Sequence, residues 1–330
     1  MRATDGQDSV KYDVVVVGGA AAGLSGALTL VRARRSVLVV DGGKPRNAPA
    51  SGVHGFLTRD GTNPSVLLEA GRAEVRRYGA ELLDGRVASA ERIEDGFVVT
   101  LDDGRRFGAR RLLVATGLVD ELPDVSGVRE RWGRDVLHCP YCHGWEVRDQ
   151  PIGVLASGPR AAHQALLFRQ WSADVALFLH TAPRPTDEEA EGLAARGIAV
   201  VEGEVASLEV VGDGLAGVRM GGGEVVARRV VVVMPHFVAR TEMLAGLGLE
   251  TTVHPLGVGE HVEADATGLT AVPGVWVAGN VADLMANVVG AAEAGVRAGA
   301  AINADLVAED TGRAVATHRA RREAQIAGRR

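Results

Sequence analysis

The chain has 330 residues, a formal net charge of −6 and 46% hydrophobic residues, with only 4% aromatic ones and 43 glycines. This length allows two domains with cores of their own, and the composition favours a compact α/β protein. The negative charge gives no electrostatic support for binding nucleic acid or an anionic membrane. No apolar run reaches the ~18–20 residues of a membrane span, and the polar start has no signal-peptide core, so we expect a cytoplasmic protein.

The first part of the chain follows a strand, turn, helix, strand order. Residues 1–11 are polar and are expected to be loose. An apolar, β-branched run predicts a strand at 12–17 that is buried on both faces. The elements that follow are a glycine turn at 18–23, an alanine- and leucine-rich helix at 24–33, and a second strand at 36–40 that ends in Asp41.

This order predicts a dinucleotide site. The glycine turn lets backbone N–H groups approach a pyrophosphate at a helix N-terminus, and the Asp41 carboxylate can accept hydrogen bonds from a ribose. Ala20 occupies the middle glycine position, so we expect a slightly wider turn. The Gly- and Pro-rich loop at 42–62 either connects elements or forms a wall of the cofactor cleft.

Further elements are expected on both sides of the chain centre. A helix is predicted at 66–78, an antiparallel excursion at 81–90, 96–101 and 105–110, and a buried strand with a glycine turn at 112–117. Near the C-terminus, a strand at 275–280 precedes a helix at 287–306, whose small residues predict close packing. The arginine-rich tail at 311–330 is expected to be a solvated helix.

The middle of the chain repeats the strand–turn–helix order in a degenerate form. A strand at 152–156 runs into a turn containing Gly158 and Ala161, and the next strand is expected at 175–179. Ala156 occupies the first glycine position, and no acid follows the second strand. A nicotinamide nucleotide site and a nucleotide fold kept only as a scaffold therefore both remain open.

Both cysteines of the chain lie in one motif, His138-Cys139-Pro140-Tyr141-Cys142-His143. Cysteines spaced C-x-x-C can close a disulfide, and a neighbouring imidazole can hold a proton while it opens. A zinc site is disfavoured, because His138 and His143 would have to supply the remaining ligands within six residues. Two thiols without a function are disfavoured by the flanking Pro, Gly and His residues.

With these motifs, residues 12 to about 308 resemble low-molecular-weight thioredoxin-reductase-type flavoproteins. The resemblance rests on the first glycine turn with Asp41, Ala115-Thr116-Gly117, the C-x-x-C pair and Val275-Trp276-Val277-Ala278-Gly279-Asn280. It implies an α/β fold with two Rossmann-like domains. A discontinuous FAD domain at 1–120 and 241–330 would be interrupted by a smaller NAD(P)-binding-like domain at 121–240 that carries the cysteines.

The resemblance also implies roles for single residues. Cys139 is expected to exchange with the substrate, Cys142 to face the flavin and His143 to accept a proton, whereas His54 and His138 are secondary candidates for which a surface or packing role is as probable. Gly158 and Ala161 would contact NADP(H) if it binds, and no metal is expected. The residues implied for FAD binding are Gly18, Gly19, Ala20, Ala22, Gly23, Asp41, Gly42, Arg46, Asn47, Thr116, Gly117, Gly279, Asn280, Asn287 and Val288.

Several departures from the family pattern refine the expected function. His143 stands where thioredoxin reductases usually have Asp, which is similar to the branch of small-molecule dithiol oxidases that close gliotoxin- and holomycin-like disulfides. The arginine motif for a 2′-phosphate is absent, Ala156 replaces a glycine, and Asn280 and Asn287-Val288 replace the usual Asp and Arg-Gln. The first feature favours a thiol oxidase, the next two weaken the case for NADPH, and the last implies FAD binding that is altered in detail.

Three functions follow from this resemblance. The first is FAD-dependent oxidation of a small-molecule dithiol to a disulfide, with oxygen as the electron acceptor. The second is an NAD(P)H-dependent disulfide reductase that serves a thioredoxin-like protein, and the third is a flavin-bound redox sensor with little turnover. A homodimer is implied in each case.

Overall fold

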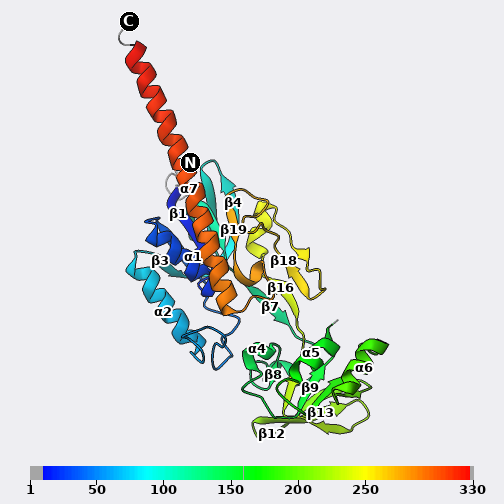
Figure 1. Cartoon of the computed structure of the whole chain (residues 1–330). Coiled ribbons are helices and arrows are strands. Elements are labelled where there is room, and N and C mark those ends of the chain that lie inside the picture. The colour runs from blue at the N-terminus through cyan, green and yellow to red at the C-terminus, as the bar shows by residue number, and fades with distance from the viewer. Residues whose placement is uncertain (1–9, 159, 328–330) are drawn as a thin grey trace.

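The structure is a computed structural model that describes residues 10–158 and 160–327. Two lobes are visible in Figure 1, one in blue, cyan and orange and the other in green, with helix α7 projecting from the first lobe. Each lobe contains a sheet with helices packed against it, parallel in the second lobe and parallel except for the antiparallel pairs β4–β5 and β5–β6 in the first. The predicted α/β fold with two Rossmann-like units is therefore confirmed.

The first lobe is built on a seven-stranded sheet in the order β3-β2-β1-β6-β5-β4, with β19 paired to β6. Alternate valines of β1 enter two different cores, Val14 and Val16 on one face and Val15 and Val17 on the other. This burial on both faces explains the continuously apolar run. The strands are β1 (Val10–Val17), β2 (Val37–Asp41), β3 (Glu81–Asp84), β4 (Val87–Ile93), β5 (Gly96–Leu101), β6 (Arg106–Val114) and β19 (Val275–Val277).

Three expectations for this lobe were wrong in detail. The run 81–90 forms two strands, and β3 pairs in parallel with β2 instead of joining an antiparallel excursion. The runs 105–110 and 112–117 belong largely to one strand, β6, because Arg110 and Arg111 in its middle are paired with acids of α7. Val10 and Lys11 belong to β1, while the rest of the N-terminal segment, residues 1–9, lies outside the described residues.

Helix α7 runs from Val288 to Ala327 without a break, so the predicted helix and the predicted tail helix are one element. Its first part packs on α1 (Ala21–Arg32), and the other helix of this lobe is α2 (Pro64–Arg77). Ion pairs join α7 to β6, among them Arg111 with Asp305 and Glu309. Beyond these pairs the helix is exposed and projects away from the lobe (Figure 1).

The second lobe has a five-stranded parallel sheet in the order β11-β10-β9-β15-β8 and a three-stranded antiparallel sheet β12-β13-β14. Its helices include α5 (Ala161–Phe168) beside β9 and β10, and the shorter α3 (Val128–Arg131), α4 (Pro140–His143) and α6 (Asp187–Ala195). The strands are β8 (Val136–Leu137), β9 (Ile152–Leu155), β10 (Val175–Phe178), β11 (Ala199–Val201), β12 (Val205–Val211), β13 (Gly214–Met220), β14 (Val225–Ala227) and β15 (Val230–Val232).

Two strands connect the lobes side by side. β7 (Leu118–Glu121) leaves the first lobe and β16 (His236–Ala239) returns to it, and the two pair in antiparallel fashion (Figure 1). β17 (Thr252–Val253), β18 (Gly259–His261) and the 3-10 helices η1 (Glu242–Leu247) and η2 (Gly279–Val281) complete the return. None of the helices in the described ranges is long and apolar enough to cross a membrane.

The contact between α1 and α7 depends on glycines, as the small residues predicted. A Cβ built on Gly295 would lie 2.0 Å from the carbonyl oxygen of Ala22, and one on Gly299 would lie 2.8 Å from that of Gly26. Backbone atoms cannot move aside as a flexible side chain can. Any larger residue at these positions must push the two helices apart.

We predict that Gly295→Ala destabilises the protein by about 1–3 kcal/mol, the cost of overpacking. The matched control is Gly312→Ala on the exposed part of the same helix, where nothing lies within 4 Å of the added carbon. That change is expected to stabilise the helix by about 0.5–1 kcal/mol. Urea unfolding of both variants measures the difference, and equal effects at the two positions would contradict the close contact.

Candidate functional site

The predicted FAD residues cluster because four parallel strands end at the same edge of the first sheet. Gly18 follows β1, Asp41 ends β2, Thr116 lies just after β6 and Gly279 lies just after β19. These strands are neighbours in the order β2-β1-β6-β19, and all are parallel. The crevice outside the carboxyl ends of parallel strands is where dinucleotides bind in such folds.

The turn between β1 and α1 has the form that a pyrophosphate requires. A Cβ on Gly23 would lie 1.8 Å from the carbonyl oxygen of Gly18, so only glycine fits at this position. Ala20, the N-cap residue of α1, makes no side-chain capping bond, and the first turn contains no acid. The N–H groups of this helix end are therefore available to an anionic ligand. Gly19 and Ala22 lie in the same turn.

Asp41 already has a protein partner. One carboxylate oxygen pairs with Arg72 of α2, and the other accepts the N–H of Gly43 at 3.1 Å. The carboxylate lies directly under the glycine turn, because a Cβ on Gly19 would be 2.6 Å from its Cγ. Arg72 thus fixes the acid at the place where a ribose hydroxyl is expected.

The substitution of Asn280 for the family's Asp has a local explanation. The Asn280 amide nitrogen donates to the carbonyl oxygens of Asp283 at 3.0 Å and of Ala286 at 2.9 Å, which a carboxylate could not do. These bonds shape the turn that leads to Asn287, whose side chain accepts the N–H of Gly290 at 2.9 Å, immediately before α7 begins at Val288. Asn280 therefore helps to fix the turn from which α7 begins.

Other predicted cofactor residues have structural partners too. The Arg46 guanidinium makes two bonds to Asp120, at 2.8 and 2.6 Å, and its Cζ lies 4.9 Å from the centre of the Phe237 ring. Arg46 therefore ties the loop at 42–50, which also holds Gly42 and Asn47, to the strands between the lobes. The Thr116 hydroxyl donates to the carbonyl oxygen of Arg240, and Gly117 has a φ of 73° that favours glycine.

The residues of this edge thus fit FAD: an uncapped helix end, an acid held under a glycine turn and a second helix, α7, beginning nearby. They would hold its pyrophosphate at the N-terminus of α1 and its adenosine ribose at Asp41. The individual FAD contacts stay predictions.

The redox motif lies at the carboxyl edge of the second lobe's sheet, directly after β8. Cys139 and Cys142 are joined in a disulfide, with their Cα atoms 5.2 Å apart. Cys139 caps the short helix α4, and its Sγ accepts the N–H of Cys142 at 3.2 Å. This N–H points at Cys139 Sγ and would stabilise a thiolate there once the cysteine pair is reduced.

His143 is placed as a base. Its Nδ1 lies 2.9 Å from the carbonyl oxygen of Cys142 and must donate to it, since a carbonyl only accepts. The Nε2 atom is therefore the nitrogen that can take up a proton. Burial lowers the pKa of His143, with Glu146 raising it and His54 lowering it further. At neutral pH the imidazole is mostly uncharged and able to accept a proton.

His138 has a packing role. Its ring contacts the Phe237 ring edge to face, with the centroids 5.3 Å apart. Burial lowers the pKa of His138 from 6.5 to about 4, and the nearby positive charge of Arg46 contributes. A ring with so low a pKa is unsuited to accepting a proton near pH 7.

The second turn differs from the first. Gly158 lies between β9 and α5, and Ala161 is the first residue of α5. The Ser157 hydroxyl donates to the carbonyl oxygen of Met234 at 3.1 Å and accepts the N–H of Met234 at 2.9 Å. His180, at the place of a ribose-binding acid, accepts the N–H of Val205 at 3.0 Å through Nδ1. Neither of these side chains supplies the carboxylate that binds a ribose in such folds, and the individual NADP(H) contacts stay predictions.

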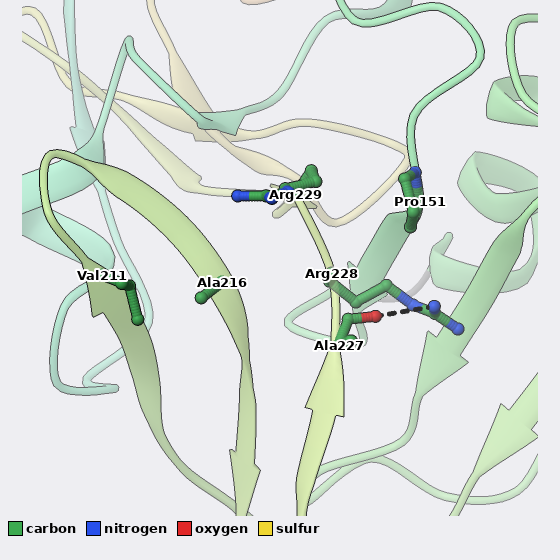
Figure 2. Close-up of a pocket in the computed structure, with 6 residues that line it drawn as sticks. All are labelled: Pro151, Val211, Ala216, Ala227, Arg228 and Arg229. Atoms are coloured by element: carbon green, nitrogen blue, oxygen red, sulfur yellow. Dashed lines mark hydrogen bonds between the residues drawn. The ribbon is translucent and has the colours of Figure 1, made fainter.

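One surface cavity of the second lobe is unrelated to the redox motif. It has a volume of about 320 Å³ and is lined by Pro151, Val211, Ala216, Ala227, Arg228 and Arg229 (Figure 2). Pro151 precedes β9 and Arg229 precedes β15, so the cavity lies at the amino edge of the parallel sheet, whereas Cys139 follows its carboxyl edge. The two arginine side chains point in opposite directions (Figure 2).

A family model described as pyridine nucleotide-disulphide oxidoreductase matches residues 12–295. The chain belongs to this family. It is therefore an oxidoreductase with FAD as its expected cofactor, and the predicted relation to thioredoxin-reductase-like proteins is confirmed.

Among the relatives, thioredoxin reductase sirT of Leptosphaeria maculans is 30% identical, over 91% of this chain and 95% of its own. The solved structure of HlmI is 49% identical, with a TM-score of 0.87, covering 94% of this chain and 98% of that one. A probable thioredoxin reductase of Arthroderma benhamiae is 38% identical, but over only 44% of this chain and 38% of its own length.

Two residues beside the site were not found from the sequence. Trp171, after α5, packs against Gly144, where an added Cβ would lie 2.7 Å from its ring, and its ring centre is 5.8 Å from that of Tyr141. Arg72 pairs with Asp41 across 31 positions in the chain. No motif in the sequence indicates either contact, because each joins residues from two separate elements.

We predict that His138→Phe reduces the loss of stability in acid. In the wild type the unfolded chain binds the proton more tightly than the folded protein, so the contribution of His138 to stability falls as the pH drops from 6.5 to about 4. The loss amounts to about 3 kcal/mol at the acid end. Phenylalanine keeps the aromatic contact with Phe237 but does not titrate.

Urea unfolding at about pH 7.5 and about pH 4.5 measures this difference. His163→Gln, at an exposed position of α5, serves as the control and should keep the wild-type pH dependence. An unchanged acid loss in His138→Phe would show that the buried imidazole is not its source.

Proposed function

We propose that the protein oxidises a small-molecule dithiol to a disulfide through Cys139 and Cys142, with FAD as cofactor and oxygen as the final electron acceptor. The observation that carries the proposal is the disulfide followed by His143, whose Nε2 is free to accept a proton. The similarity to sirT and HlmI along nearly the whole chain supports a thiol–disulfide oxidoreductase.

The exchange follows from the motif. A substrate thiolate attacks Cys139 Sγ, the Cys139–Cys142 bond breaks, and Cys142 leaves as a thiolate. The second substrate thiolate then attacks the sulfur bonded to Cys139, which closes the substrate disulfide and releases the Cys139 thiolate. The substrate loses two electrons and two protons, and His143 Nε2 is placed to accept one proton. FAD, when bound, supplies the acceptor for the two electrons and passes them to oxygen.

A reductase that serves a thioredoxin-like protein is the second candidate, because relatives of the chain are thioredoxin reductases. It needs a nicotinamide cofactor. No acid follows β10 to bind its ribose, His180 stands there instead, and the arginine motif for a 2′-phosphate is absent, which favours the oxidase. A redox sensor would have the same site but negligible turnover.

The proposal includes the domain roles expected from the sequence. Residues 1–120 and 241–330 would bind FAD, and 121–240 would carry the disulfide, in agreement with the two separate parallel sheets. A cytoplasmic location suits a pair of cysteines that must cycle between thiol and disulfide. A homodimer is proposed from the family resemblance.

We predict that, without oxygen, a small dithiol bleaches the flavin of the purified protein, whereas NADPH does so far more slowly. Absorbance spectra recorded during anaerobic titration with dithiothreitol and with NADPH measure both. Readmitting oxygen should restore the oxidised spectrum after the dithiol. Rapid bleaching by NADPH would instead establish the reductase.

We predict that Cys142→Ser lowers the rate of dithiol oxidation by more than about 100-fold. Without Cys142 the protein cannot form the disulfide that accepts the two electrons of the substrate. The variant should stay yellow, since none of the residues expected to hold FAD is changed. Oxygen consumption with a dithiol measures the activity, and the flavin spectrum is the control for folding. Undiminished oxidation would rule out the cysteine pair as the route.

A further inference from the structure

A loop of the first lobe reaches the redox motif through His54. The His54 imidazole lies between two carboxylates, with Nδ1 3.5 Å from Asp60 Oδ1 and Nε2 3.5 Å from Glu146 Oε1. Asp60 belongs to the same loop, whereas Glu146 follows Cys142 by four positions. Each ring nitrogen of His54 therefore faces one carboxylate, and the two carboxylates come from different segments of the chain.

The loop at 53–62, which carries His54, is closed by hydrogen bonds of its own backbone. Its ends are joined by two backbone hydrogen bonds of 2.8 Å, from Val53 N to Thr62 O and from Gly61 N to Val53 O. Asp60 Oδ1 also accepts the N–H of Gly55 at 2.9 Å. Thr58 has a φ of 74°, a conformation that a threonine adopts only when its surroundings impose it. His54, at the base of this closed loop, has a side chain that is 21% exposed.

A second contact joins the same region to the second lobe. A Cβ on Gly133 would lie 2.6 Å from Pro49 Cβ, so the chain just before the loop packs directly on the segment that leads into β8. The redox motif follows β8. Two contacts, Pro49 with Gly133 and His54 with Glu146, therefore locate the loop against the segment that carries the cysteines.

We propose that His54 is a positioning residue for the redox motif: through Glu146 it fastens the segment 139–146 to the loop at 53–62 and keeps His143 in place beside the disulfide. Neither His54 nor Glu146 exchanges electrons or bonds with the substrate. Their contribution is to limit the orientations of α4, whose four residues make too short a helix to be rigid alone. Glu146 raises the pKa of His143 and His54 lowers it, in agreement with the closeness of the three residues.

The test compares His54→Ala, Glu146→Gln and the double variant with the wild type. Asp149→Asn is the matched control, because Asp149 is exposed and its carboxylate makes no ion pair or hydrogen bond within the described residues. Two readouts are used. The first is amide hydrogen exchange of 51–62 and 139–146, and the second is the rate of anaerobic flavin reduction by dithiothreitol in a single turnover.

Each single variant should raise exchange in both segments and slow flavin reduction about tenfold, and the double variant should be no slower than the slower single one, as expected for partners in one contact. Melting temperatures and the values of Asp149→Asn should stay near those of the wild type. The proposal is overturned if the two single effects multiply in the double variant, or if His54→Ala leaves exchange in 139–146 unchanged.

The rate readout depends on the proposed function, whereas the exchange readout does not. If dithiothreitol fails to reduce the wild-type flavin, the proposed function fails and hydrogen exchange alone decides the role of His54. If the wild type is reduced normally and only the exchange result is negative, the positioning role fails and the proposed function stands.

Discussion

The backbone contacts around helix α1 determine the geometry of the cofactor edge. The first turn of α1 can lie against the end of β1 because Gly23 has no side chain to meet the carbonyl oxygen of Gly18, and α7 can lie on α1 because Gly295 faces Ala22. These contacts join backbone to backbone and leave no flexible group to absorb a change. The direction in which the N–H groups of α1 point, and so the place where an anion binds, follows from them.

The glycine turns and the disulfide lie at the carboxyl edges of two different sheets. The first sheet carries the glycine turns at its edge, and the second carries the disulfide after β8. The loop with Pro49 and His54 contacts the second lobe beside that disulfide. Burial lowers the pKa of His143 and a carbonyl oxygen bonds its Nδ1, so Nε2 is the nitrogen at which the ring can take up a proton. The positions of sulfur and base are thus set by backbone atoms and burial.

Residues that depart from the family pattern are part of the protein's own hydrogen bonding. Asn280 uses its amide nitrogen to bond the turn before α7, and His180 uses a ring nitrogen to bond Val205. The bond of Asn280 lies within one turn and that of His180 joins two separate segments of the chain, so the two side chains help to fix the turns in which they lie.

The sequence by itself determined the α/β class, the two Rossmann-like units and the place of the redox pair, because buried parallel strands, glycine turns and a C-x-x-C motif are local patterns with fixed physical causes. Strand boundaries failed at Arg110 and Arg111, whose charges resemble a loop until α7 supplies their partners. The pairing of Asp41 with Arg72, the packing of Trp171 on Gly144 and the contact of His54 with Glu146 were decided only by the tertiary structure. Each of these contacts joins residues from separate elements. The residue pattern within one element does not indicate which side chain of another element will contact it.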